Sequence, residues 1–237
     1  MSTLVVYSDT TDGYIASSNT STGATNDYAI VRAGTWLVAD TTQTNLWVGQ
    51  DWTYDVENDE NSLSVDEAFL GFDTSSIPDT DTVSAAVFNL TSSGDFSTTD
   101  FTIEARLYDW GTGLTTADWV AGASLSGLTL LAHRDTASGW TGNTAYDLTD
   151  DAFAANVNKT GTTRLLLCSS RTTAGTSPTI DVREYVNAYS ADSTGTTADP
   201  KLTVTYAAGG GTLFLMLEDN SGSYELEDGS GGTLLES

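Results

Sequence analysis

The chain has few positive charges, a single cysteine, a single histidine and only three prolines. Its 8 Lys and Arg residues stand against 33 Asp and Glu residues, which gives a formal net charge of −25. A charge of this sign and size repels phosphate backbones and anionic lipid surfaces, so nucleic acid is excluded as a natural partner. With one cysteine no disulfide can form within the chain, and the place of Cys168 in the apolar run LLLC predicts a buried, inert thiol.

The N-terminal stretch MSTLVVYSDT has no basic residue and only four consecutive apolar residues. We therefore expect neither a secretory signal nor a membrane insertion. Yet the chain is rich in Thr, Ser, Gly, Asp and Trp, which is typical of proteins that work outside a cell. A virion protein, assembled in the host cytoplasm and released by lysis, reconciles the two observations. A signal sequence missing from the chain is the alternative.

Short apolar runs separated by turn residues predict an all-β fold with little helix, fewer than roughly one residue in eight. The clearest strand is FTIEARLY, in which Phe101, Ile103, Ala105 and Leu107 share one face. Short helical turns are expected at residues 115–120 and 150–157. The expected strands are residues 4–7, 28–32, 46–48, 68–72, 83–91, 101–108, 128–133, 145–148, 164–168, 180–185 and 202–206.

The stretch FLGFDTSSIPDTDTVSAAVFNL, residues 69–90, resembles the signature of the DNRLRE-type β-sandwich family. Further similar segments follow the family's order: DGYIASS at 12–18, TADW at 116–119, YDLTDDAFAANV at 146–157 and ADPKLTVTY at 198–206. The resemblance implies a jelly-roll-like antiparallel β-sandwich akin to carbohydrate-binding modules, as found in extracellular and phage structural proteins, without catalysis. Two features depart from the family: the long segment GQDWTYDVENDENSLSV at 49–65, and the acidic pair Asp66 and Glu67 where a basic residue is common.

The segment DTSSIP that follows Phe72 is interpreted as a strand connection, because Asp73 and the serines can bond nearby amides and Pro78 fixes a turn. No catalytic residue is predicted. His133 has Asp135 and Ser138 nearby in sequence, but a triad is defined by geometry, and a structural histidine at a strand end is the expectation. The many acids indicate surface charge rather than a paired carboxylate site for glycoside hydrolysis.

Residues 49–65 hold the candidate ligand groups. Trp52 and Tyr54 are the aromatic residues that we expect to be exposed and to stack on sugar rings. Asp55, Glu57 and Asp59 alternate like the first ligands of a calcium loop, but the sixth position is Glu60 instead of Gly. We expect no required cofactor, with calcium at these three acids as the alternative.

The last residues differ from the body of the chain. We expect a β-sandwich domain at 1–206, a Gly-rich hinge at 207–211 and a C-terminal β-meander at 212–237, where Leu-Glu recurs at 217, 226 and 235 with Gly-containing segments between. In the apolar run LFLML, residues 213–217, both faces of the expected strand need cover. We therefore expect this strand to pair with another chain, as in strand addition or an intertwined trimer. The predicted assembly interface is Leu213, Phe214, Leu215, Met216 and Leu217.

Two function classes follow. The first is a non-enzymatic structural protein of a tailed phage or related virus, in the head, a fibre or the tail. Its C-terminal segment would contact other copies of the chain and other virion proteins, and its projecting sandwich would be free to contact host glycans. The second is a carbohydrate-binding module of an extracellular or cell-surface protein. Detection in purified particles favours the first class, and affinity for a polysaccharide without particle association favours the second.

Overall fold

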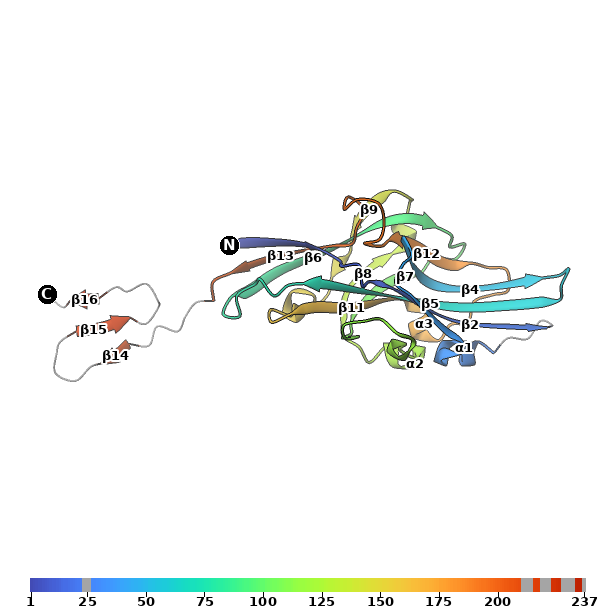
Figure 1. Cartoon of the computed structure of the whole chain (residues 1–237), viewed down its shortest axis with the longest axis horizontal. Helices are drawn as coiled ribbons and strands as arrows, with labels where there is room; N and C mark the ends of the chain where they lie inside the picture. The colour runs from blue at the N-terminus through green and yellow to red at the C-terminus, as the bar shows by residue number, and fades with distance from the viewer. Residues whose placement is uncertain (23–26, 210–214, 218–222, 227–232, 236–237) are drawn as a thin grey trace.

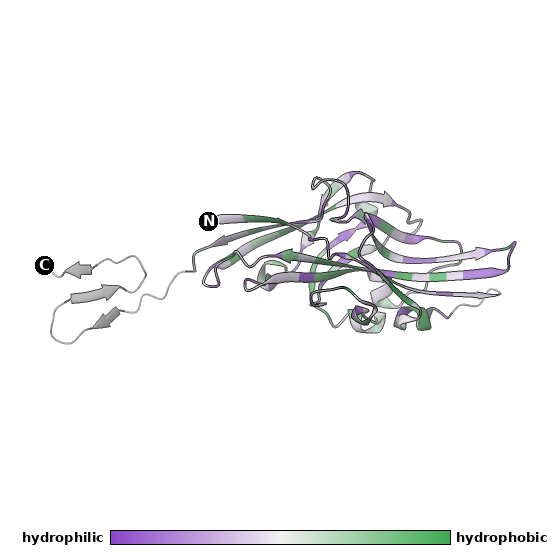
Figure 2. Cartoon of the chain, viewed as in Figure 1, coloured by the Kyte–Doolittle hydropathy of each residue, from purple (hydrophilic) through white to green (hydrophobic). Residues whose placement is uncertain are grey.

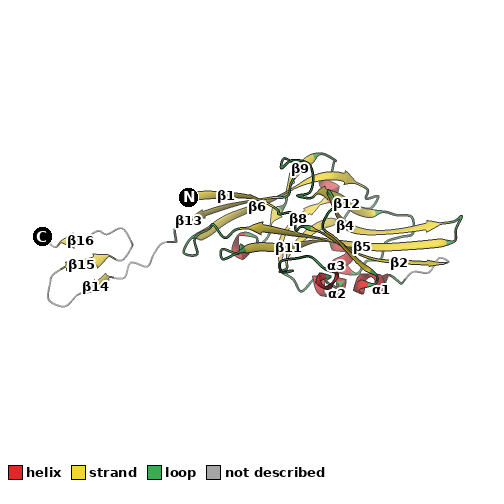
Figure 3. Ribbon diagram, viewed as in Figure 1, coloured by secondary structure: helices red, strands yellow, loops and turns green. Residues whose placement is uncertain are grey.

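The computed structural model describes residues 1–22, 27–209, 215–217, 223–226 and 233–235. This part of the chain is 48% strand and 12% helix, so the prediction of an all-β protein with little helix is confirmed (Figure 3). A large curled antiparallel sheet forms a sandwich-like body, and three short strands near the C-terminus form a second sheet (Figure 1).

Thirteen strands make up the large sheet, and every pairing in it is antiparallel. Ten of them run in the order β1-β13-β6-β12-β4-β5-β11-β7-β8-β10, while β2 pairs with β3 and β5, and β9 pairs with β6. The strands are β1 (Ser2–Tyr7), β2 (Gly13–Thr22), β3 (Leu37–Asp40), β4 (Asn45–Asp55), β5 (Glu60–Asp73), β6 (Thr82–Asp95), β7 (Thr102–Leu107), β8 (Leu130–Asp135), β9 (Thr144–Asp147), β10 (Thr149–Asp150), β11 (Thr162–Ser169), β12 (Glu184–Tyr189) and β13 (Lys201–Ala207).

The main core lies inside the curl of this sheet. Phe88 packs between Phe72 and Phe153, with ring centroids 5.7 and 5.9 Å away. In β7, Ile103 and Ala105 are buried as the alternation predicts, and apolar residues recur along the strands of the body (Figure 2). Burial of these side chains supplies the driving force for the closed sheet.

The segment after Phe72 is the strand connection that the sequence predicts, between β5 and β6. An oxygen of Asp73 accepts hydrogen bonds from the backbone amide and hydroxyl of Ser75. Thr74 is fully buried, and its hydroxyl bonds to the carbonyl oxygens of Asn158 and Gly161. The carbonyl of Pro78 then accepts the amide of Asp81, which closes the turn before β6 begins.

Residues 28–32, predicted as a strand, instead begin helix α1, and that prediction is wrong. The side chain of Asp27 accepts a hydrogen bond from the amide of Ala29 at 3.0 Å and caps the helix. Only Val31 of the helix is buried, where its carbonyl accepts the hydroxyl of Ser17. The helical segments are α1 (Tyr28–Gly34), α2 (Gly122–Leu125), α3 (Ser170–Ala174), and the 3-10 turns η1 (Thr116–Asp118), η2 (Thr136–Ser138) and η3 (Ala154–Asn156).

The segment 49–65, which departs from the family pattern, extends β4 and β5 into a long hairpin. β2 pairs with the other edge of β5 over its full length, from Gly13 opposite Phe69 to Thr22 opposite Glu60. The three strands lie side by side (Figure 1). Residues 180–185 are predicted as a strand, but β12 begins only at residue 184. Asp181 has a φ of 61°, which is outside the strand region, and its amide donates a hydrogen bond to the carbonyl of Trp52.

The predicted C-terminal meander is present as β14 (Leu215–Leu217), β15 (Ser223–Leu226) and β16 (Thr233–Leu235), paired in sequence order. Of the predicted interface, Leu213 and Phe214 lie outside the described residues, and for Leu215–Leu217 the structure describes the backbone alone. In the predicted hinge, Gly209 packs so closely on the Thr80 carbonyl oxygen that an added Cβ would lie 2.0 Å from it.

Candidate functional site

The predicted glycan-binding residues Trp52 and Tyr54 are both half-buried on one face of β4. Trp52 packs against Val31, Leu63 and Val65, and its indole N–H donates to the side chain of Asn61. The exposed tryptophan is instead Trp36, whose exposed fraction is 66%. Trp52 is therefore part of the packing between the hairpin and α1.

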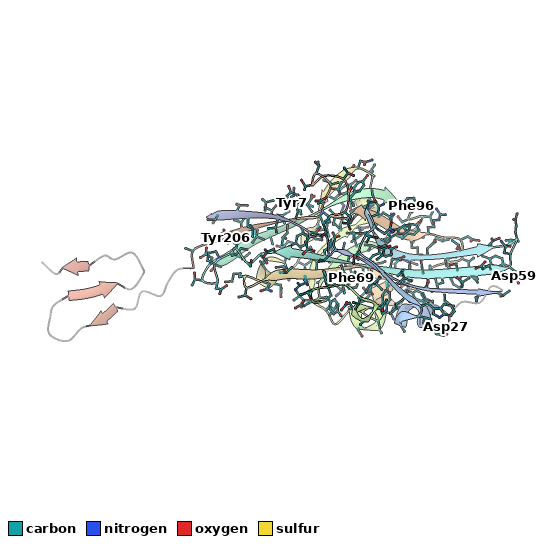
Figure 4. All side chains as sticks on the ribbon, in the orientation of Figure 1. Tyr7, Asp27, Asp59, Phe69, Phe96 and Tyr206 are labelled. Carbon is teal, nitrogen blue, oxygen red and sulfur yellow. The ribbon has the colours of Figure 1, made fainter. Side chains whose placement is uncertain are left out.

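The predicted calcium ligands lie at the tip of the β4–β5 hairpin, where Figure 4 labels Asp59. Asp55 accepts the amides of Glu57 and Asn58 with one carboxylate oxygen and the Asn58 side-chain amide with the other. Asp59 bonds the hydroxyl of Tyr54 at 2.7 Å. In the part of the chain that the structure describes, no three His, Cys, Asp or Glu side chains are grouped to hold a metal ion. Calcium at the tip stays a prediction.

His133 and Cys168 occupy separate places. His133 lies inside β8 and not at its end, and its Nδ1 lies 2.6 Å from the carboxylate of Asp151, which follows β10, so the contact joins β8 to the end of β10. Asp135 caps the next turn by accepting the amide of Ala137. Cys168 is fully buried, and burial first, then the nearby Glu67 and Glu104 carboxylates, raise the pKa of its thiol above the ordinary value. Neither residue is arranged with Ser138 as a triad.

A pocket of about 190 Å³ lies on the opposite face of the hairpin from Trp52 and Tyr54. Strand alternation places residues 51 and 64 on one face of β4 and β5, and residues 52 and 63 on the other. Cross-strand pairing brings Asp66 level with Ala16 of β2 on one side and Gly49 of β4 on the other. The lining residues are Tyr14 and Ala16 of β2, Trp47 and Asp51 of β4, Ser64 and Asp66 of β5, and Tyr185 of β12.

Aromatic rings form the apolar side of this pocket. Trp47 stacks on Tyr185 with ring centroids 5.2 Å apart and lies 6.4 Å from Tyr14. Phe96, labelled in Figure 4, stacks on Tyr185 at 5.2 Å and extends the array beyond the lining residues. Each stacked pair holds the rings in fixed orientations, which gives a ligand a preformed apolar surface.

Two acids form the polar side. Asp66 is only 7% exposed, and within the described residues its carboxylate has one hydrogen bond, a long contact of 3.5 Å from the hydroxyl of Ser64. Burial, followed by the nearby charge of Asp51, raises the pKa of Asp66 from 3.8 to about 7. Burial also raises the pKa of Asp51 above its ordinary value, although the charge of Arg183 opposes this. Oδ1 of Asp51 is buried without a hydrogen-bond partner.

Gly49 makes room for the pocket. Its φ is +138°, a conformation that side chains rarely adopt, and a Cβ there would lie 2.2 Å from the Glu184 carbonyl oxygen and 2.6 Å from the Cα of Tyr185. Glycine therefore lets β4 and β12 approach closely enough to place Tyr185 beside Asp66. Carboxylates and aromatic rings that line one pocket are suited to hold a ligand with a flat apolar face and with polar hydrogens, as in hydroxyl or amino groups.

The predicted aromatic residues Trp52 and Tyr54 lie on β4 but do not line this pocket, which the sequence does not predict. Only one signal pointed to it: the acidic pair Asp66 and Glu67 inside the otherwise apolar stretch before Phe69. Glu67 faces away from the pocket into a second core cluster near Val120, whose amide bonds its carboxylate. The aromatic residues gave no local signal, because Tyr14, Trp47 and Tyr185 come from three separate strands.

Comparisons with known proteins do not name a family: no family model and no curated protein matches the chain. The DNRLRE-type resemblance therefore stays a prediction. Across the described ranges, none of the helices has the length and apolar character needed to span a bilayer.

Proposed function

We propose that the protein is a non-enzymatic binding protein whose sandwich recognises glycans in the pocket formed by β2, β4, β5 and β12. The observation that carries the proposal is the combination of stacked rings, Trp47 on Tyr185, with the nearly buried carboxylate of Asp66 in one cavity. Sugar rings present apolar C–H faces and hydroxyl groups, which match aromatic faces and carboxylate acceptors respectively.

The placement of the acids favours binding over hydrolysis. Asp51 is directly opposite Ser64 in the register, so Asp66 is its diagonal neighbour on the same face of the sheet. Diagonal neighbours stand side by side and point in the same direction. A glycosidase instead needs its two carboxyl groups to flank the scissile bond, one as acid and one as base or nucleophile. Asp51 and Asp66 both line the pocket from this one face.

The experiment is a glycan-array screen followed by calorimetry with the wild-type protein and three tryptophan variants. We expect Trp47→Ala to reduce affinity for the bound glycan by at least roughly fivefold, since stacking of a ring on an aromatic side chain contributes about 1–3 kcal/mol. Trp36→Ala is the matched control, because Trp36 is exposed outside the pocket. Trp52→Ala tests the site that the sequence favours. Unchanged binding in Trp47→Ala, or loss in Trp52→Ala alone with the fold intact, would refute the pocket assignment.

A second proposal concerns the setting in which the sandwich acts: a structural component of a virus particle, in the head, tail or a fibre. The observation in its favour is the separate C-terminal sheet, in which β14 and β16 each pair only with β15 among the described strands. A two-edged sheet of three short strands is too small for independent stability and invites pairing with another chain. The strong negative charge suits a solvated particle surface.

Deletion of residues 209–237 tests this second proposal. We expect the truncated chain to stay folded, soluble and monomeric, while the full chain forms a homo-oligomer, measured by light scattering and by mass spectrometry of purified particles. Equal oligomerisation and equal incorporation of both chains would show that the C-terminal segment is not the assembly contact. The test does not depend on glycan binding, so the two proposals stand or fall separately.

A further inference from the structure

The pocket lining contains acidic side chains, which attract a positively charged ligand, and no basic side chain that could neutralise a negatively charged ligand. Its charged members are Asp51 and Asp66, and no Lys, Arg or His lines it. Neither acid belongs to an ion pair in the described part of the chain, where the four pairs involve other acids. The charge of Arg183, which is exposed and precedes β12, acts on Asp51, whereas the charge that acts on Asp66 is that of Asp51.

The burial of Asp66 distinguishes this pair of pocket acids from acidic residues that happen to lie close together on the surface. A carboxylate that is more than nine-tenths buried normally has a cation or several hydrogen-bond donors, because desolvation is otherwise costly. Asp66 has one donor at 3.5 Å, and Oδ1 of Asp51 has none. Both side chains line the same cavity. The missing partner is therefore a positively charged donor that enters from the pocket.

The rings beside the acids favour the same kind of ligand. The faces of Tyr and Trp attract cations through their quadrupole, most strongly where water is excluded. A cavity of about 190 Å³ is smaller than the pockets of drug-sized ligands and has room for a single ring or head group. Ser64 and the phenol groups of Tyr14 and Tyr185 supply further hydrogen-bonding groups for hydroxyls.

We infer that the pocket selects a sugar residue with a free, protonated amine, with the ammonium group bonded to Asp66 and Asp51 and the ring face on Trp47. This inference rests on the proposed glycan-binding function and specifies its ligand class. Sugars with a carboxylate are rejected, because they would meet two acids and a net charge of −25 without a cation. A lysine side chain has the ammonium group but lacks a ring face and hydroxyls for the aromatic and polar parts of the pocket.

The test compares four probes by calorimetry at about pH 7, where an amine keeps much of its charge and Asp66, whose pKa is about 7, is ionised in about half of the molecules before the ligand binds; the buffer has physiological ionic strength. The probes are a glucosamine tetramer, its N-acetylated counterpart, cellotetraose and a lysine-containing tetrapeptide. We expect the glucosamine tetramer to bind at least about tenfold more tightly than the other three, the factor that one hydrogen bond to a charged group supplies. Asp66→Asn and Asp51→Asn should each remove most of this preference while neutral sugars still bind.

Asp79→Asn is the matched control, because it removes an exposed acid between β5 and β6 and changes net charge equally. It should keep the preference, which separates local recognition from general attraction of a cation to an acidic protein. Equal binding of amine and neutral tetramers, equal binding of the lysine peptide, or a preference that survives both pocket substitutions would overturn the inference while the glycan site stands. Failure of every sugar to bind, or binding that Trp47→Ala leaves unchanged, would overturn the proposed function itself.

Discussion

Asp12 gives the sharpest stability prediction, since it is a fully buried acid at the start of β2. One of its oxygens accepts the hydroxyl of Ser8 at 2.9 Å and the amide of Ala191 at 3.1 Å, and the other is buried without a partner. Burial raises its pKa from 3.8 to about 7 against the effect of these hydrogen bonds. In Asp12→Asn the side-chain oxygen can still accept the hydrogen bonds from Ser8 and Ala191, while an uncharged NH2 group replaces the oxygen that has no partner.

The expected effect grows with pH. Below the unfolded value of 3.8 the acid is neutral in both states, and the wild-type protein has no penalty. As pH rises toward about 7 the unfolded chain loses the proton first, so the free energy of unfolding falls by roughly 1.4 kcal/mol for each pH step. The full penalty is roughly 4 kcal/mol as an upper limit, from the difference between 3.8 and about 7. Asp12→Asn should therefore match the wild type near pH 4 and exceed it near pH 8.

Urea denaturation at several pH values between about 4 and 8 measures this difference, in buffer with a chelator so that divalent cations do not pair with the acids. The exposed Asp79→Asn variant serves as the control and should follow the wild-type curve. Asp66 contributes to the wild-type slope in the same direction, so the comparison is always between variants at one pH. Parallel curves for Asp12→Asn and wild type, or a variant that is less stable near pH 8, would refute the reasoning.

Three further predictions follow from single contacts. Gly49→Ala should destabilise the protein by at least about 2 kcal/mol and abolish glycan binding in the same calorimetric assay, whereas Gly111→Ala, where an added Cβ meets nothing within 4 Å, should cost about 1 kcal/mol for its positive φ. Thr74→Val should cost about 1–3 kcal/mol in urea denaturation, because it removes a buried hydroxyl that bonds to the carbonyls of Asn158 and Gly161 and to the buried hydroxyl of Thr163; a cost near zero would contradict that role. Cys168 should react with a thiol reagent only at the rate of local or global unfolding, and rapid reaction of the native protein would contradict its burial.

Strands with one buried face could be predicted from sequence, because their alternation is visible in a few residues. Ile103 and Ala105 are buried, as expected for β7. The prediction of a strand at residues 28–32 is wrong although Tyr28, Ile30 and Val31 have high strand propensity. The N-cap by Asp27 and the burial of a single side chain favour a helix instead. A helix of seven residues is too short to display its period.

The pocket depended on information that no local pattern contains. Asp66 follows Leu63 and Val65 in an alternating strand, and alternation alone assigns such an acid to the solvent face. It is buried because β2 and β4 flank it on both sides, and because Tyr185, which packs closely on Gly49, and Trp47, which stacks on Tyr185, line the same pocket. These contacts come from register and from a glycine conformation, which require the folded sheet.

Three of the nearly buried acids of the body, Asp12, Glu67 and Asp66, differ in the contacts that hold them. Asp12 accepts two hydrogen bonds that tie the N-terminal segment to the loop at Ala191, and Glu67 accepts the amide of Val120 beneath the second core cluster. In each case the protein obtains a fixed contact between distant segments in return for desolvating the acid. Asp66 makes no such contact: its donor is Ser64 of the same strand, at 3.5 Å, and it faces a cavity instead of a neighbouring segment. Because Asp66 stabilises no contact between segments of the fold, its burial supports the proposal that it serves to bind a ligand.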